Sequence, residues 1–129
     1  MEQHFYEEIK RILTEARNKV YYTANFIMVE AYWNIGKCIV EQQGGEVKAE
    51  YGIGLIKELS KQMTNDFGKG FKSTNLKYMR QFYLVFPNSH ALRDELSWTH
   101  YRSLIRVENN NARQFYLEEA LNRIGVQGS

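Results

Sequence analysis

The chain of 129 residues is 43% hydrophobic and 14% aromatic, which is enough for a folded core and too apolar for a disordered protein. Its formal net charge is only +2, and its one cysteine, Cys38, excludes an intrachain disulfide and a cysteine-based zinc site. It has one proline, Pro87, and no segment with the two-residue period of a β-strand. The sequence therefore predicts one all-α domain over residues 1–124.

The N-terminal sequence, MEQHFYEEIKR, mixes charges and lacks the apolar core of a signal peptide. No run approaches the ~18–20 apolar residues that a membrane span needs. We therefore expect a cytoplasmic protein that does not use a membrane.

Residues 3–43 predict one long helix, or two helices joined with a bend, because apolar side chains recur at steps of three, four or seven. A single helix would be roughly 57 Å long, which exceeds the diameter of a compact domain of this size. An aromatic band widens the apolar stripe, and a band on two sides indicates burial by two partners. The second partner is either the rest of this chain or another copy, which would give a homo-oligomer through the long helix. The band consists of Tyr21, Tyr22, Phe26, Met28, Tyr32 and Trp33.

Residues 50–86 predict two helices joined by a tight glycine turn. The first helix carries an apolar stripe that ends at Phe67. Gly68-Lys69-Gly70 then breaks it, because glycine adopts the left-handed conformation that closes a helix. Ser73 and Thr74 are suitable N-cap residues for the second helix. The expected buried positions are Leu55, Ile56, Leu59 and Met63 in the first helix and Leu76, Met79, Tyr83 and Phe86 in the second.

The second helix of this unit presents a polar and basic face over residues 73–81, which is typical of a DNA-binding helix-turn-helix. Between Lys57 and Arg80, six basic residues stand against two acidic ones. The alternative is a pair of packed helices whose polar face is only solvated. If the unit binds double-stranded DNA, we expect Thr74, Asn75, Lys77, Tyr78 and Gln81 to enter the major groove and Lys57, Lys61, Lys69 and Lys72 to contact phosphates.

Residues 97–124 predict two further helices. Ser97 caps the first of them, and Arg102 and Arg106 lie away from its apolar side. The last helix is expected to end near residue 124, followed by a frayed tail at 125–129. The residues expected to face inward are Trp98, Tyr101, Leu104 and Ile105 in the first helix and Ala112, Phe115, Tyr116, Ala120 and Leu121 in the second.

The sequence contains no pattern that predicts catalysis. Its three histidines form no HExxH motif, and Gly52-Ile53-Gly54 lacks the third glycine of a nucleotide-binding loop. Asp94 and Glu95 lie in a loop with no lysine on a neighbouring strand, so a metal-dependent nuclease centre is not supported. We expect no cofactor, no metal and no small-molecule substrate, and we expect Cys38 to be a buried thiol.

Four stretches together resemble a known family: AYWNIGKCIVEQ (31–42), AEYGIGLIKELSKQMTNDFGKGFKSTNLKYMRQFYLVFP (49–87), LSWTHYRSLIRVEN (96–109) and ARQFYLEEA (112–120). They are similar to the N-terminal domain of the YhcG-like family, a domain of unknown function that precedes a PD-(D/E)xK-type nuclease domain. The resemblance covers roughly residues 12–121. It implies an all-helical domain that binds DNA through the central unit and serves a nuclease further along the polypeptide. The catalytic carboxylates and lysine of that nuclease domain have no counterpart in this sequence.

Most positions that match the family motifs are explained physically as turn, cap or core. Arg80 is either held by a carboxylate of a neighbouring helix or contacts DNA. Trp98, His100 and Tyr101 form either a packing cluster or a base-stacking surface. The matching positions are Gly68, Gly70, Phe71, Asn75, Leu76, Met79, Arg80, Phe82, Tyr83, Ser97, Trp98, His100, Tyr101 and Arg106.

Overall fold

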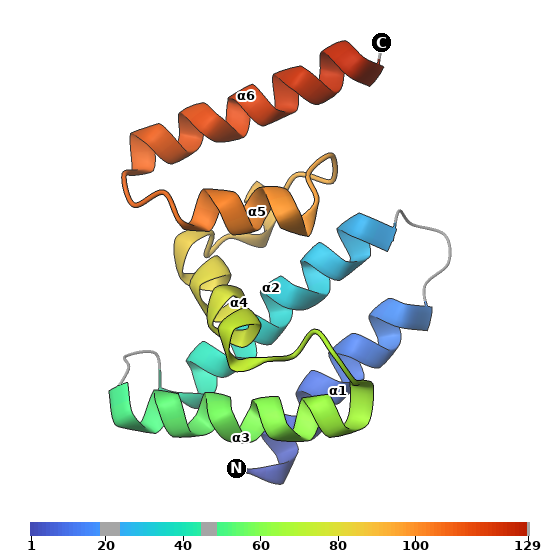
Figure 1. Ribbon diagram of the computed structural model, residues 1–129, viewed down its shortest axis with the longest axis vertical. Helices are drawn as coiled ribbons and strands as arrows, with labels where there is room; N and C mark the ends of the chain where they lie inside the picture. The colour runs from blue at the N-terminus through green and yellow to red at the C-terminus, as the bar shows by residue number, and fades with distance from the viewer. Residues whose placement is uncertain (19–23, 45–48, 129) are drawn as a thin grey trace.

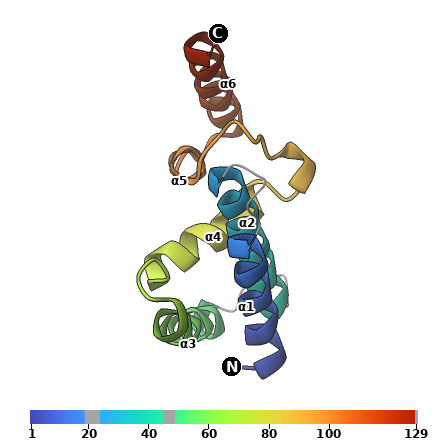
Figure 2. The same cartoon turned by 90° about the vertical axis from the view of Figure 1, so that its right-hand side faces the viewer.

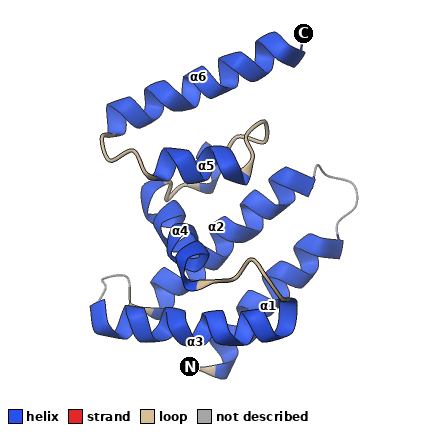
Figure 3. Cartoon of the chain, viewed as in Figure 1, coloured by secondary structure: helices blue, strands red, loops and turns tan. Residues whose placement is uncertain are grey.

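The computed structural model describes residues 1–18, 24–44 and 49–128. Over these residues the chain forms α-helices and loops without a strand, which confirms the predicted all-α class (Figure 3). None of the described helices combines the length and the apolar character that crossing a membrane requires. The elements in Figure 1 are α1 (Gln3–Asn18), α2 (Ala24–Gln42), α3 (Ala49–Phe67), α4 (Ser73–Val85), the 3-10 helix η1 (Ser89–Ala91), α5 (Trp98–Ile105) and α6 (Asn110–Gly128).

The first segment is two helices, α1 and α2, which is the second of the two alternatives predicted for residues 3–43; the alternative of one long helix is wrong. Figure 1 shows α1 running up to the grey segment and α2 running back beside it. Folding back buries the apolar stripe of each helix against the other, so that Ile9 and Leu13 of α1 share one core cluster with Ile35 of α2. The connecting residues 19–23 lie outside the described part of the chain.

Three members of the aromatic band, Met28, Tyr32 and Trp33, pack within the domain. Trp33 is 6% exposed and donates its indole N–H to the carbonyl of Phe86 at 2.6 Å. Met28 packs against the core, and the ring of Tyr32 lies 5.0 Å from that of Trp98. The second partner of the band was expected to be either the rest of this chain or another copy. At these positions it is the rest of this chain. Tyr21 and Tyr22, which belong to the same predicted band, lie outside the described residues.

Helix α4 crosses α2 with the two backbones in direct contact. A Cβ built on Gly36 of α2 would lie 1.9 Å from the carbonyl oxygen of Met79 in α4. Glycine is the only residue without a Cβ atom, so only glycine allows the two backbones to approach this closely. Gly36 therefore sets the distance between the two helices.

Two hydrophobic clusters lie on either side of this crossing, and α2 and α4 contribute to both. Figure 2 shows α1 and α3 below the crossing and α5 and α6 above it. The lower cluster includes Ile35, Ile39, Leu76 and Met79, together with residues of α1 and α3. The upper cluster consists of Val29, Trp33, Phe82, Phe86, Leu96, Tyr101, Leu104, Ile105 and Leu117.

Helix α5 begins at a capping box. The Ser97 hydroxyl accepts a hydrogen bond from the backbone N–H of His100, and the His100 side chain accepts one from the backbone N–H of Ser97. Tyr101 is fully buried, and its hydroxyl accepts a hydrogen bond from the Arg93 backbone N–H at 2.7 Å. Trp98 packs against Phe82 at 5.4 Å between ring centroids. The structure therefore uses these aromatic residues for packing.

Helix α6 differs from its prediction in two ways. It continues to Gly128, where we expected it to end near residue 124, because no proline interrupts the helix there. Phe115 and Tyr116, which we expected to face inward, are 58% and 53% exposed, and Leu117 is buried instead. The physical reason is that α6 packs mainly on α5, so only one narrow face of it is covered.

We predict that Gly36→Ala destabilises the domain by about 1–3 kcal/mol, because the added methyl group overlaps the α4 backbone at Met79. The measurement is urea unfolding followed by circular dichroism. The matched control is Gly54→Ala in α3, where an added Cβ meets nothing within 4 Å. The control should raise the free energy of unfolding by about 0.5–1 kcal/mol. Equal stability of the two variants would show that the crossing does not depend on glycine.

Candidate nucleic-acid interface

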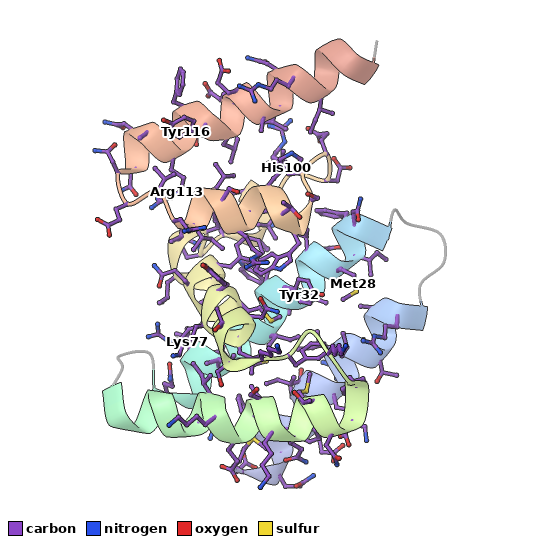
Figure 4. The ribbon with its side chains drawn as sticks, viewed as in Figure 1. Met28, Tyr32, Lys77, His100, Arg113 and Tyr116 are labelled. Atoms are coloured by element: carbon purple, nitrogen blue, oxygen red, sulfur yellow. The ribbon has the colours of Figure 1, made fainter. Side chains whose placement is uncertain are left out.

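The outer surface of α4 is polar because its apolar side is fully used in the crossing with α2. Leu76, Met79 and Phe82 are buried. Successive helical residues are rotated by 100°, so Thr74, Lys77 and Gln81 share the opposite face, and all three are exposed. We call these three residues the α4 face. Figure 4 shows the labelled Lys77 at the edge of the molecule.

The turn before α4 is fixed by backbone geometry and by one buried ring. Gly68 and Gly70 have φ of 80° and 111°, which is the region that favours glycine. Phe71 is 2% exposed, and its carbonyl accepts a hydrogen bond from the Ser60 hydroxyl at 2.7 Å. The turn therefore brings α4 to a defined position over α3, as Figures 1 and 2 both show.

The predicted phosphate-binding lysines are all exposed. Lys69 and Lys72 lie in the turn that leads directly into α4, whereas Lys57 and Lys61 lie on α3, opposite its buried stripe. Among the described residues, no carboxylate lies within 4 Å of the ammonium group of these lysines or of Lys77. Their charges are therefore not neutralised by ion pairs in the described part of the molecule.

Two of the predicted groove-reading residues have contacts within the protein. The Asn75 amide donates to the carbonyl of Gly70 at 3.2 Å and so braces the turn. Tyr78 is half-buried, and the guanidinium carbon of Arg102 in α5 lies 4.8 Å from its ring centroid. Of the five predicted groove residues, the structure leaves Thr74, Lys77 and Gln81 exposed.

Arg80 is tied to α2, through an amide and not through the carboxylate that we expected. Its Nε donates to Oε1 of Gln43, just beyond the end of α2, at 2.9 Å. Burial lowers the pKa of the guanidinium below its usual value. Arg80 therefore has a structural contact on the side of α4 that faces α2.

Two basic residues that we did not assign to the interface lie next to it. Arg102 of α5 and Arg106, just beyond its end, are exposed, and with Tyr78, Thr99 and Ser103 they line a small groove between α4 and α5. The sequence feature that indicates these two arginines as one site is their spacing of four residues on the polar side of the predicted helix. Sequence alone does not show which element that side faces.

The remaining chemistry of the described residues is sparse. They contain no group of three histidine, cysteine, aspartate or glutamate residues that could hold a metal ion. Cys38 is half-buried, and burial raises the pKa of its thiol to about 11, which keeps it protonated at neutral pH. The absence of a catalytic role stays a prediction.

Comparison with known proteins identifies the family. The family described as "DUF1016 N-terminal domain" matches residues 8–124. The protein named "Putative nuclease YhcG" of Escherichia coli (strain K12) is 40% identical over 87 residues, which are 67% of this chain and 23% of that protein. The matched region thus spans about a quarter of the relative's length. No solved structure matches the chain.

The family match covers almost the whole chain and agrees with the resemblance carried by the FGKGF and LSWTHY stretches. Its relative from Escherichia coli bears the name of a nuclease. The chain belongs to the DUF1016 N-terminal domain family, a nuclease-associated domain of unknown function.

Proposed function

We propose that this domain is a non-catalytic module that binds double-stranded DNA as the N-terminal part of a nuclease-associated protein. The observation that carries the proposal is the placement of α4. Thr74, Lys77 and Gln81 on its α4 face are exposed, while its opposite side is buried against α2. A helix held in this way is presented to a partner in one orientation, which is what groove recognition needs.

The α4 face fits a major groove in size and in chemistry. From Thr74 to Gln81 the helix rises about 10 Å, and the major groove is about 12 Å wide. Gln81 can form two hydrogen bonds with adenine, Lys77 can donate to guanine, and the methyl group of Thr74 can contact thymine. These side chains supply both donors and acceptors, so the proposal includes recognition of base edges.

The exposed lysines would add contacts to the phosphate backbone. Lys69 and Lys72 lie directly before α4, where a duplex strand that borders the groove would pass, and Lys57 and Lys61 extend the charge along α3. The name of the Escherichia coli relative supports nucleic acid as the partner. We further propose a cytoplasmic location, because that relative comes from a bacterium, whose DNA lies in the cytoplasm.

The direct test is a fluorescence-anisotropy titration with a random duplex over a series of salt concentrations. We expect log K to fall with log salt at a slope of roughly −4 to −5, if about four to six phosphates are neutralised. Binding that is absent even at low salt would refute the proposal. Binding that does not change with salt would refute the assignment of the lysines to phosphates.

The double variant Lys69→Glu/Lys72→Glu should weaken binding at least about tenfold, and equally for unrelated duplex sequences, because phosphate contacts carry no sequence information. The matched control is Lys10→Glu/Arg123→Glu, which reverses two exposed charges on α1 and α6. Anisotropy at one fixed salt concentration measures both. If the two variants bind equally, only net charge matters and the turn has no special role.

A second candidate function is that of a protein-interaction module that forms a homo-oligomer. The predicted surface, the band on the first helices, is packed internally at Met28 and Tyr32. A different observation favours this candidate: Phe115 and Tyr116 of α6 are more than half exposed, and their rings lie 5.5 Å apart. Exposed aromatic pairs of this kind are common at contacts between chains.

Sedimentation velocity tests the second candidate. If α6 mediates self-association, the chain should form an oligomer that persists at high salt, and Phe115→Ser/Tyr116→Ser should convert it to monomer. Both side chains are exposed, so the variant should keep the unfolding midpoint of the unmodified protein. A monomer at all concentrations up to about 100 μM would remove the candidate, because stable oligomers associate well below that level.

A further inference from the structure

We propose that Arg102 of α5 and Arg106, which directly follows α5, form a second phosphate-binding site, which extends the DNA-binding surface of α4 onto α5. We call these two residues the arginine pair. The inference rests on the proposed function and deepens it, because it names a further element and the group that it binds. Its ligand is the phosphate backbone of the duplex whose groove α4 would enter.

The first argument is the way in which Arg102 is held. Its guanidinium carbon lies 4.8 Å from the ring centroid of Tyr78. A cation–π contact of this kind uses the charge of the guanidinium and none of its N–H donors, so these donors stay available for hydrogen bonds. An arginine whose N–H donors are available can donate two parallel hydrogen bonds to one phosphate.

The second argument is that neighbouring arginines have contacts that the arginine pair lacks. Arg93 forms an ion pair with Glu95 at 3.0 Å, and Arg113 donates to the carbonyls that end α5, including that of Leu104 at 3.3 Å. In the described ranges, no carboxylate lies within 4 Å of the guanidinium groups of Arg102 and Arg106. Their charge is thus available to an external anion.

The third argument is the shape of the surface around the arginine pair. Thr99 and Ser103 lie on the same side of α5 at helical spacing, and both residues line the groove with the two arginines and Tyr78. Tyr78 follows Thr74 of the α4 face by four residues, so the two lie one turn apart on the same side of α4. The groove therefore joins the α4 face directly, and a strand that borders the major groove would reach both surfaces.

The test compares Arg102→Gln/Arg106→Gln with the unmodified protein in anisotropy titrations of a random duplex from about 50 to 200 mM salt. We expect roughly tenfold weaker binding at the lower salt and a slope that is less steep by about two, since each lost phosphate contact removes about 0.9. The charge-matched control is Lys10→Gln/Arg123→Gln, which should change Kd less than about twofold.

A second variant separates charge from geometry. Arg102→Lys keeps the charge but loses the planar group that stacks on Tyr78 and can bind one phosphate through two hydrogen bonds. We expect its Kd to lie between those of the unmodified protein and of the double glutamine variant. If the double variant unfolds, Arg106→Gln alone supplies the test, because this exposed side chain forms no ion pair with the described carboxylates. Its slope should be less steep by about one.

The outcomes separate this inference from the proposed function. If the unmodified protein does not bind duplex DNA at low salt, both are overturned. If it binds, and Lys77→Ala/Gln81→Ala weakens binding while the double glutamine variant matches its control in Kd and slope, the inference alone is overturned. A loss of affinity and of slope in the double glutamine variant, with the unfolding midpoint unchanged, supports the second site.

Discussion

The contact between Gly36 and the backbone of Met79 is the constraint on which the rest of the domain depends. It sets the closest approach of α2 and α4, and both hydrophobic clusters form where these helices diverge from it. Because one side of α4 is committed to this contact, only the opposite side can meet solvent or a partner. The polar character of Thr74, Lys77 and Gln81 follows from the same crossing, since an apolar residue there would have nothing to pack against.

The crossing also determines where α5 lies relative to α4. Phe82 near the end of α4 and Phe86 just beyond it pack against Tyr101 of α5, with ring centroids 4.8 and 5.5 Å from that of Tyr101. This aromatic packing fixes α5 beside α4, and Arg102, the next residue after Tyr101, then reaches the ring of Tyr78. The groove between the two helices is thus a consequence of core packing. Its lining residues are positioned by these two helices alone.

Local patterns predicted the parts of this structure that depend on neighbours in sequence. The glycine turn at 68–70, the cap at Ser97 and the buried stripe of α3 all follow from residue type and helical spacing. The return of α2 along α1 could not be predicted, because apolar steps of three and four residues continue through a bend as well as through a straight helix. The contacts of Asn75 with Gly70 and of Tyr78 with Arg102 were also not predicted. Both lie at the margin of the polar face, where distant elements decide the environment.

The distribution of charge explains how a chain with a net charge of only +2 can present a basic surface. Acidic residues form ion pairs with basic ones of the same helix in α1, α2 and α6, as in the pairs Arg11–Glu15, Lys37–Glu41 and Arg123–Glu119. Helices α4 and α5 contain no acidic residue at all. At physiological salt, charges more than about 8 Å away are largely screened, so a polyanion beside α4 and α5 would respond to their local charge and not to the net charge of the chain. Association with a phosphate backbone would then be governed by these two helices and the turn before them, although the whole molecule is nearly neutral.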